Sequence, residues 1–415
     1  MDNKMLAVLH RFSTSALRQL AVTVWITSLL LSANVSAARA QPDDAVSNPD
    51  ARGLSLTVNN YGMAFGNVPV VHGLRFNFRD MNLNEVNGAN ITILAPREPS
   101  YGVVRGLAVG LPMTGGASLT GVSIALGGIT AHETIRGIQF SLLGIGAGGG
   151  ISGITMAGLG FGSGGDVSGL NIAGLGLGAG GHLSGITLAG LGFGADGNVS
   201  GINVAGLGFG ADGNVSGINF ALLGFGADDN ISGLNVAGLG YGAGENVSGL
   251  NAALLGFGAG EDVRGISIGG LGIGAGGSIT GINLAGLGLA SGDEIRGISL
   301  SGMGIASGES VTGIAVAGLG IASQQLRGIT VSPAAGAMEL ARGLFLAPAY
   351  FRIEDGSLQG VSVSAFNHIR GDQHGVTIGL YNYARNLRGV QIGVINYAAN
   401  NPRGLRMLPL VNANL

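Results

Sequence analysis

The sequence predicts an all-β fold, a parallel β-solenoid built from glycine-rich coils of about 16 residues. Three observations predict it: an internal repeat of fixed period, apolar residues in pairs two positions apart, and glycine at fixed places in each repeat. Glycine supplies 82 of the 415 residues, against an ordinary share of about 7 %. Because 46 % of the residues are hydrophobic and only 10 % are charged, the chain has enough apolar surface to fold.

Residues 1–40 have the layout of a secretory signal peptide. Lys4, Arg11 and Arg18 precede an apolar run over residues 20–31, and the sequence Ala-Arg-Ala at 38–40 reads as the cleavage site. An uncleaved anchor helix is the alternative, but the apolar run is shorter than the ~20 residues that a membrane span needs. We therefore expect an exported protein.

The next segments are expected to be a linker with an N-terminal cap over residues 41–70 and degenerate repeats over 71–118. A regular array with a period of 16 residues follows over 119–331. Looser repeats of about 14–17 residues are expected over 332–401, and a C-terminal cap over 402–415. A cap is needed because the end coil of a solenoid otherwise exposes unpaired backbone groups.

One repeat, VSGINVAGLGFGADGN over residues 199–214, serves as the frame for all the others. Five of its columns are apolar in nearly every copy, those of Val199, Ile202, Val204, Leu207 and Phe209. An amphipathic helix would need apolar residues three and four positions apart, whereas pairs two apart indicate short strands with one buried face. The sequence therefore predicts that these five columns form the core between stacked coils.

Two glycine columns, those of Gly201 and Gly208, are expected to mark corners of the coil. In the C-terminal copies Asn367, Asn382 and Asn396 align with the Gly208 column. Glycine and asparagine are the residues that most readily accept positive φ. The sequence therefore predicts a left-handed backbone conformation in the Gly208 column.

Two polar columns lie beside the apolar ones. The Asn203 column is expected to form a ladder of side-chain hydrogen bonds between coils. The Ser200 column is expected to face solvent, because Arg264 and Arg296 replace serine there.

An outer-membrane β-barrel is the alternative fold. Its strands would need roughly ten residues of strict alternation, whereas here the apolar phase breaks every few residues. An amyloid-like or irregular glycine-rich state is a further alternative. The solenoid explains the repeat, the apolar pairs and the glycine columns together.

No catalytic, cofactor-binding or metal-binding residue is predicted. The turn carboxylates of Asp196, Asp212 and Asp228 share a column that suits Ca²⁺ ligands, but the acids of later repeats move by one position. We interpret them as a solvated turn. His368 and His374 lie close in sequence without an acid at ligand spacing, so no zinc site is expected.

Several function classes are disfavoured by composition. A net charge of −3, with Lys4 as the only lysine, does not suit a nucleic-acid-binding protein. Matches to Gly-x-Gly-x-x-Gly are frequent, but none opens a helix after a strand, so no nucleotide site is expected. A carbohydrate-active enzyme would need a cluster of carboxylates on one face, and the repeats offer acids only in turns.

The C-terminal segment reads RGVQIGVINYA over residues 388–398 and NPRGLRMLPLVNA over 401–413. It resembles the closing repeats of bacterial surface repeat-containing proteins of uncharacterised function. The resemblance implies export and association with the cell surface or outer membrane, with no known activity and no catalytic residues to carry over.

We therefore expect an exported repeat protein with a structural, adhesive or binding role at the bacterial cell surface, and not an enzyme. Its partner is left open between the cell envelope and an extracellular ligand. The alternative function is a channel or pore, which we would expect if the chain formed an outer-membrane β-barrel.

Overall fold

The computed structural model describes residues 53–81, 83–94 and 102–414. These residues divide into two compact units, the first ending at Asp228 and the second beginning at Asp229. The predicted signal peptide over residues 1–40 lies outside the described residues.

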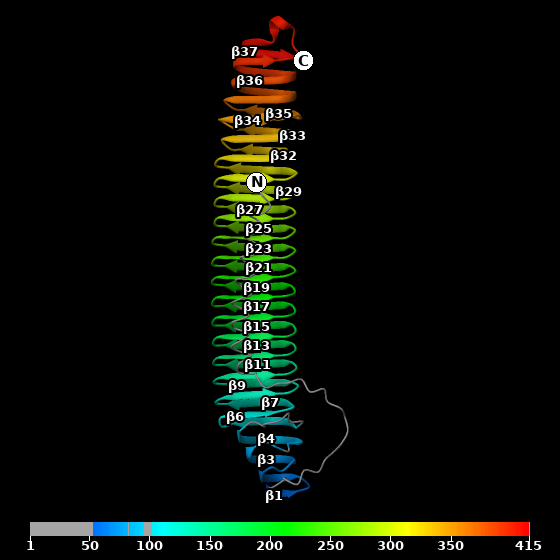
Figure 1. Cartoon of the computed structure of the whole chain (residues 1–415), viewed down its shortest axis with the longest axis vertical. Helices are drawn as coiled ribbons and strands as arrows, with labels where there is room; N and C mark the ends of the chain where they lie inside the picture. Colours follow the sequence, from blue (N-terminus) through cyan, green and yellow to red (C-terminus); the bar gives the residue numbers. More distant parts are fainter. Residues whose placement is uncertain (1–52, 82, 95–101, 415) are drawn as a thin grey trace. The chain divides into compact units, whose positions relative to one another are not determined.

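The first unit is a parallel β-solenoid in which each regular coil contributes one long and one short strand (Figure 1). In the frame repeat these are β17 (Val199–Ala205) and β18 (Gly208–Ala211), joined by a turn. Val199 of β17 pairs with Leu183 of the coil before and with Val215 of the coil after, in parallel register. The predicted period of 16 residues is therefore the spacing between hydrogen-bonded neighbours.

The long strands of this unit stack on one another, and the short strands form a second stack. The other long strands are β7 (Ser118–Ala125), β9 (Ile135–Ser141), β11 (Ile151–Ala157), β13 (Val167–Ala173), β15 (Leu183–Ala189) and β19 (Val215–Ala221). The other short strands are β6 (Met113–Gly116), β8 (Gly128–Ala131), β10 (Gly144–Ala147), β12 (Gly160–Ser163), β14 (Gly176–Ala179), β16 (Gly192–Ala195) and β20 (Gly224–Ala227).

The N-terminal end of the first unit begins with an antiparallel hairpin of β1 (Gly53–Val58) and β2 (Tyr61–Gly66). Its two-residue turn places Asn59 and Asn60 at φ 52 and 67, the geometry that favours asparagine in tight hairpins. Parallel pairing starts at the next strand and continues through β3 (Val70–Arg79), β4 (Glu85–Leu94) and β5 (Val103–Gly110).

The second unit repeats the same coil. Its long strands are β21 (Ile231–Ala237), β23 (Val247–Ala253), β25 (Val263–Gly269), β27 (Ile279–Ala285), β29 (Glu294–Ser301) and β31 (Ser310–Ala317). Its short strands are β22 (Gly240–Ala243), β24 (Gly256–Ala259), β26 (Gly272–Ala275), β28 (Gly288–Ser291) and β30 (Gly304–Ser307).

Toward the C-terminus extended backbone continues around the corners of the coil. The elements there are β32 (Gly320–Val331), β33 (Ala334–Leu346), β34 (Tyr350–Ile353), β35 (Ser357–Val363) and β36 (Phe366–Ala398), then the short 3₁₀ helix η1 (Arg403–Leu405) and β37 (Met407–Asn414). Two successive parts of the long strand β36 pair with β34 and with β35, respectively. β37 lies antiparallel to β36 and is the last strand of the unit.

The predicted solenoid is confirmed, and the alternative of an outer-membrane β-barrel is wrong. Within the described residues, strands of successive coils pair in parallel, and β1–β2 and β36–β37 are antiparallel. An up-and-down barrel would instead need antiparallel neighbours throughout.

The predicted core is only partly right. Val199 and Phe209 are buried, but the other inward columns are those of Asn203, Ala205 and Ala211. Ile202 is 39 % exposed, and Val204 and Leu207 are partly exposed. Side chains of a strand alternate between two faces, and the apolar pair Ile202 and Val204 occupies the outward one.

The two glycine columns behave differently. Gly201 has φ +104, and a Cβ there would lie 2.0 Å from the carbonyl oxygen of Gly185 in the preceding coil. The left-handed conformation predicted for the Gly208 column is wrong, because Gly208 does not have positive φ. Gly208 is a site of close approach, where a Cβ would lie 2.3 Å from the carbonyl oxygen of Gly224.

The alignment of the C-terminal asparagines with Gly208 is also wrong. Asn367 pairs with Phe351, so it occupies the inward column that Phe209 represents. Asn367, Asn382 and Asn396 are fully buried and none has positive φ. They were misplaced because the repeat length changes in this segment, which hides the register from the sequence.

Candidate functional site

Charge is confined to one edge of the coils. Between Leu119 and Val331 every Asp, Glu and Arg falls in four columns, those of Ser200, Asp212, Gly213 and Asn214. We call these columns the polar edge. Acidic residues outnumber arginines on it, so this edge carries net negative charge.

The arginines of the polar edge point to solvent, which confirms the prediction for the Ser200 column. Arg264 and Arg296 are each more than half exposed. Each pairs at 2.5 Å with a neighbouring carboxylate, Arg264 with Asp262 and Arg296 with Glu294. Exposed pairs of this kind contribute little to stability.

The outward apolar columns form the opposite surface, which we call the apolar edge and define by the columns of Ile202, Val204 and Leu207. Phe220, Leu191 and Leu223 of these columns are 40–44 % exposed. Members in the first unit with similar exposure are Ile138, Phe140, Leu143, Ile154, Met156, Leu159, Leu175, Ile186, Leu188 and Ile218. Members in the second unit are Leu234, Leu239, Leu250, Leu255, Ile266, Ile268, Leu271, Ile282, Leu284, Leu287, Ile298, Leu300, Met303, Ile314 and Leu319.

The backbone at the apolar edge is hydrogen-bonded from coil to coil, even in its turn. The N–H of Gly206 donates to the carbonyl of Ala189 at 3.0 Å, and the N–H of Leu207 donates to the carbonyl of Leu191 at 2.7 Å. The N–H of Gly208 donates to the same Leu191 oxygen at 3.2 Å. Since these donors already have partners, removing water from this edge does not leave them unsatisfied.

The predicted asparagine ladder is confirmed in part, and it lies inside the coils. Asn283, which has Ser267 and Ser299 as neighbours in register, has no hydrogen-bond partner for its amide among the described residues. Asn203 Nδ2 donates to Asn219 Oδ1 at 2.9 Å in the first unit. Asn235 Nδ2 donates to Asn251 Oδ1 at 3.0 Å in the second. These side chains are buried, so the ladder serves the packing of the coils and is closed to an external ligand.

The turn carboxylates predicted to share one column belong to successive coils. Asp196, Asp212 and Asp228 are exposed on the polar edge. In the described parts of the chain no group of three or more His, Asp or Glu side chains could hold a metal ion. His368 and His374 both lie on β36, where His368 contacts Tyr383 and His374 pairs opposite Gln359.

A buried ionic cluster near the N-terminal end was missed from the sequence. Arg75 and Asp80 are fully buried and form an ion pair. Arg75 also donates from Nη1 to Asn90 Oδ1 at 2.9 Å and from Nε to the Val68 carbonyl at 3.0 Å. Asn77 Nδ2 donates to Asp80 at 2.9 Å. Apart from Arg75 Nη2, which has no partner among the described residues, these groups bond to one another away from water, so the cluster is structural.

An outward row of rings marks the C-terminal coils of the second unit, and we call His368, Tyr383 and Tyr397 the aromatic row. The rings of Tyr383 and Tyr397 stack with centroids 5.4 Å apart, and His368 meets Tyr383 edge-on at 5.1 Å. The Tyr350 hydroxyl lies 3.4 Å from His368 Nδ1.

Neighbouring groups shift the pKa of His368, which belongs to the row, and of Glu354, which lies beside it. Partial burial, together with the positive charges of Arg370 and Arg352, lowers the pKa of His368. A hydrogen bond from Arg352 lowers the pKa of Glu354. At neutral pH His368 is therefore an uncharged ring, and Glu354 is an anion between two arginines.

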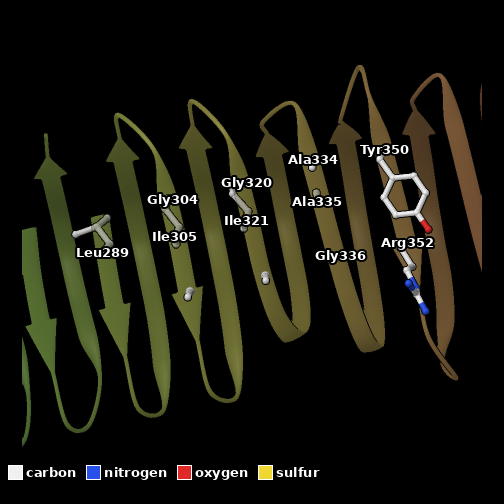
Figure 2. A pocket seen from close by; sticks show the side chains of 12 residues that line it. Leu289, Gly304, Ile305, Gly320, Ile321, Ala334, Ala335, Gly336, Tyr350 and Arg352 are labelled. Carbon is white, nitrogen blue, oxygen red and sulfur yellow. The ribbon is translucent and has the colours of Figure 1, made fainter. Parts of the chain in front are cut away.

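A shallow groove of about 590 Å³ lies beside this row, on the outer face of the short strands (Figure 2). Tyr350 and Arg352 stand at one end of it, next to positions with little or no side chain. Those positions are Gly304, Ala306, Gly320, Ala322, Ala334 and Gly336.

Comparison with known protein families, curated proteins and solved structures finds no match for this chain. The part of the chain that the structure describes contains no helix able to cross a lipid bilayer.

Proposed function

We propose that this protein is an exported, non-enzymatic structural or adhesive protein of the bacterial cell surface, and that it lies against a lipid membrane through its apolar edge. The observation that carries the proposal is the separation of charge within each coil. Acids and arginines gather on the polar edge, while Ile202, Val204 and Leu207 represent columns without any charge between Leu119 and Val331.

A lipid surface suits the apolar edge for two physical reasons. Moving apolar surface out of water gains roughly 25 cal/mol per Å², and the exposed columns repeat this gain at every coil. A backbone that enters an apolar phase must have its polar groups paired. The N–H groups of Gly206, Leu207 and Gly208 meet this need through bonds to the preceding coil.

Lipid is a better occupant than a second copy of the chain. Ile202 and Val204 lie on the outward face of β17, and Leu207 sits in the turn that follows, so the apolar edge bends around a corner of the coil. Fluid acyl chains can follow such a bend, whereas a rigid second copy would cover only part of it. Elements with a charged face and an apolar face commonly lie in the membrane interface in this way.

Export rests on the sequence layout of residues 1–40 and on the C-terminal resemblance to bacterial surface repeat proteins. Localisation of the full-length protein in expressing cells, with added protease to probe exposure, tests this part. We expect the mature protein in the cell envelope and open to protease from outside. A cytoplasmic protein that retains residues 1–40 would contradict it.

Flotation of the purified protein with vesicles of phosphatidylethanolamine and phosphatidylglycerol tests the lipid contact. The wild-type protein should float with the vesicles, and the double variant Ile218→Glu, Leu223→Glu should reduce the bound fraction at least fivefold. These residues are 46 % and 41 % exposed, so the variant should still fold, which circular dichroism checks.

Ser216→Glu is the matched control, since it adds a charge on the same strand as Ile218 but on the polar edge, where Arg264 is tolerated. It should float like the wild type. Vesicle binding that ignores the double variant, or no binding at all, would overturn the lipid contact. Oligomers that form without vesicles and disappear in the double variant would assign the edge to a second copy.

A further inference from the structure

The N-terminal hairpin leaves β1 as an edge strand of the first unit (Figure 1). Among the described residues β1 pairs with β2 alone, while β2 goes on to pair with β3. The two-residue turn has positive φ at both positions, so Val58 and Tyr61 beside it form a hydrogen-bonded pair. Bonding then alternates along the strand. The N–H and C=O groups that point away from β2 are therefore those of Gly53, Ser55 and Thr57.

The edge of β1 lacks the features that normally protect a sheet edge. Such edges carry charged side chains, proline or a bulge, because their unpaired backbone groups otherwise accept another strand. The hairpin from Gly53 to Gly66 contains no charged residue and no proline. β37, the last strand of the second unit, is different, since it carries Pro409 and pairs with β36 through an irregular register. Of these two strands, β1 is the one that remains open to association.

One face of β1 is apolar and strongly exposed. Leu54 and Leu56 are each 60 % exposed, and Val58 is 79 % exposed. They alternate with Ser55 and Thr57, whose hydroxyl oxygens lie 2.6 Å apart on the other face. A further strand with the same alternation would cover the leucines and would also pair the open backbone groups.

We propose that β1 pairs in antiparallel orientation with β1 of a second copy, so that two chains join through their N-terminal hairpins. A two-fold axis at Ser55, perpendicular to the sheet, places this residue opposite its own copy and keeps the apolar faces on the same side. Leu54 then lies opposite Leu56 of the second copy, where cross-strand apolar pairs stabilise a sheet. Such an interface is closed by symmetry, and the uncharged edges meet without repulsion.

Other occupants fit this edge less well. A lipid would leave the backbone groups of Ser55 and Thr57 unpaired, which is costly in an apolar phase. Residues 41–52 precede β1 in the sequence, but their two prolines and three aspartates do not suit a paired strand. One pair of six-residue strands buries less than the roughly 1,600 Å² of a standard interface, so we expect a dimer of micromolar affinity. The proposal depends neither on export nor on the lipid contact.

Ser55→Cys tests the pairing directly, because the protein has no cysteine of its own. Facing residues of a hydrogen-bonded antiparallel pair lie about 5.5 Å apart between their Cα atoms, a separation that a disulfide can bridge. Mild oxidation of the purified mature protein should convert most of this variant into a covalent dimer on non-reducing gels. Ser216→Cys, on the polar edge away from the hairpin, is the matched control and should not form one.

Sedimentation velocity measures the dimer without a cross-link. Thr57→Pro removes an outward N–H but no bond to β2, and it should weaken dimerisation at least tenfold with an unchanged circular dichroism spectrum. Leu56→Lys gives a second variant, which places a charge next to the two-fold axis and should act in the same direction. The dimer should persist in the double variant Ile218→Glu, Leu223→Glu, which separates this contact from the lipid contact.

A wild-type protein that stays monomeric at high micromolar concentration would overturn the proposal. A dimer that is insensitive to both Thr57→Pro and Leu56→Lys would also overturn it, as would equal cross-linking of Ser55→Cys and Ser216→Cys. Loss of the dimer in the Ile218→Glu, Leu223→Glu variant would assign the contact to the apolar edge instead of β1. Loss of vesicle flotation in Leu56→Lys, with dimerisation unchanged, would assign the hairpin to lipid.

Discussion

Asn203 and Asn219 share a hydrogen bond inside the first unit, with Nδ2 of Asn203 2.9 Å from Oδ1 of Asn219. The bond joins equivalent positions of successive coils, and both side chains are buried. A buried amide costs less free energy where a partner replaces water. Stacking at constant register supplies that partner, because the neighbouring coil offers the same group at the same place.

Asn203→Ala should therefore destabilise the protein by about 1–3 kcal/mol, since it leaves a buried acceptor without this donor. Urea unfolding followed by circular dichroism measures the change. Ser200→Ala on the same strand alters the polar edge and should leave the midpoint nearly unchanged. Equal midpoints for the two variants would show that the buried bond contributes nothing.

Gly201 and Gly210 lead to opposite expectations for the same substitution. Gly201→Ala forces a Cβ against the Gly185 carbonyl at φ +104 and should lower the melting temperature clearly. Gly210 has open space at its Cβ position and no positive φ. Gly210→Ala should therefore be neutral or stabilise the protein by up to about 1 kcal/mol. Thermal melts of both variants decide, and a stable Gly201→Ala protein would contradict the corner at this position.

Phe209 and Phe220 allow the inward and outward faces to be compared with the same change. Phe209 stacks between Phe193 and Phe225 with centroids 4.5 and 4.8 Å away, so Phe209→Ala should cost about 3–5 kcal/mol. Phe220 is 44 % exposed, and Phe220→Ala should cost far less. Urea midpoints measure both. A larger loss at Phe220 would mean that the faces are assigned the wrong way round.

The buried pair of Arg75 and Asp80 should be sensitive to the loss of one partner. Asp80→Ala leaves the guanidinium buried and uncompensated, and we expect a loss of about 3–5 kcal/mol. The double variant Arg75→Met, Asp80→Ala removes the stranded charge and should recover part of that loss. Glu85→Ala, which breaks the exposed pair with Arg105, is the control and should barely move the urea midpoint. An Asp80→Ala protein as stable as this control would contradict the role of the cluster.

His368 should make stability depend on pH. Because burial and the charges of Arg370 and Arg352 lower its pKa in the folded protein, the unfolded chain takes up a proton at higher pH than the folded one. The contribution of His368 to the free energy of unfolding is fully present above the unfolded pKa of about 6.5. It is lost as the pH falls through the lower pKa of the folded protein. Glu354, the Tyr350 hydroxyl and the ring of Tyr383 also lie beside His368, and the lowered pKa of Glu354 keeps that group ionised in this range.

Urea midpoints of the wild type and His368→Gln between pH 7 and pH 5 test this expectation. The wild type should lose more stability than the variant as the pH falls. Parallel curves for the two proteins would show that His368 does not titrate differently on folding.

Much of the coil could be read from the sequence. The period of 16 residues, the corner at Gly201 and the polar turn at Asp212 each repeat along the chain, and repetition makes a weak local signal unambiguous. The Arg75–Asp80 cluster could not be read in this way. It occurs once, in coils of irregular length, and its members come together only because β3 and β4 stack.

The amino-acid sequence by itself determined that this protein forms short parallel strands in coils of constant length, because spacing and glycine placement are local properties of each repeat. Only the tertiary structure decided which side of those strands is the interior. Alternation offers two faces, and here the outward face, with Ile202 and Val204, is as apolar as the inward one. Closure of the coil decides which face is buried. Asn203, Ala205 and Phe209 face inward, and Asn203 forms a hydrogen bond to the next coil. The larger aliphatic side chains remain outside, where they form the apolar edge.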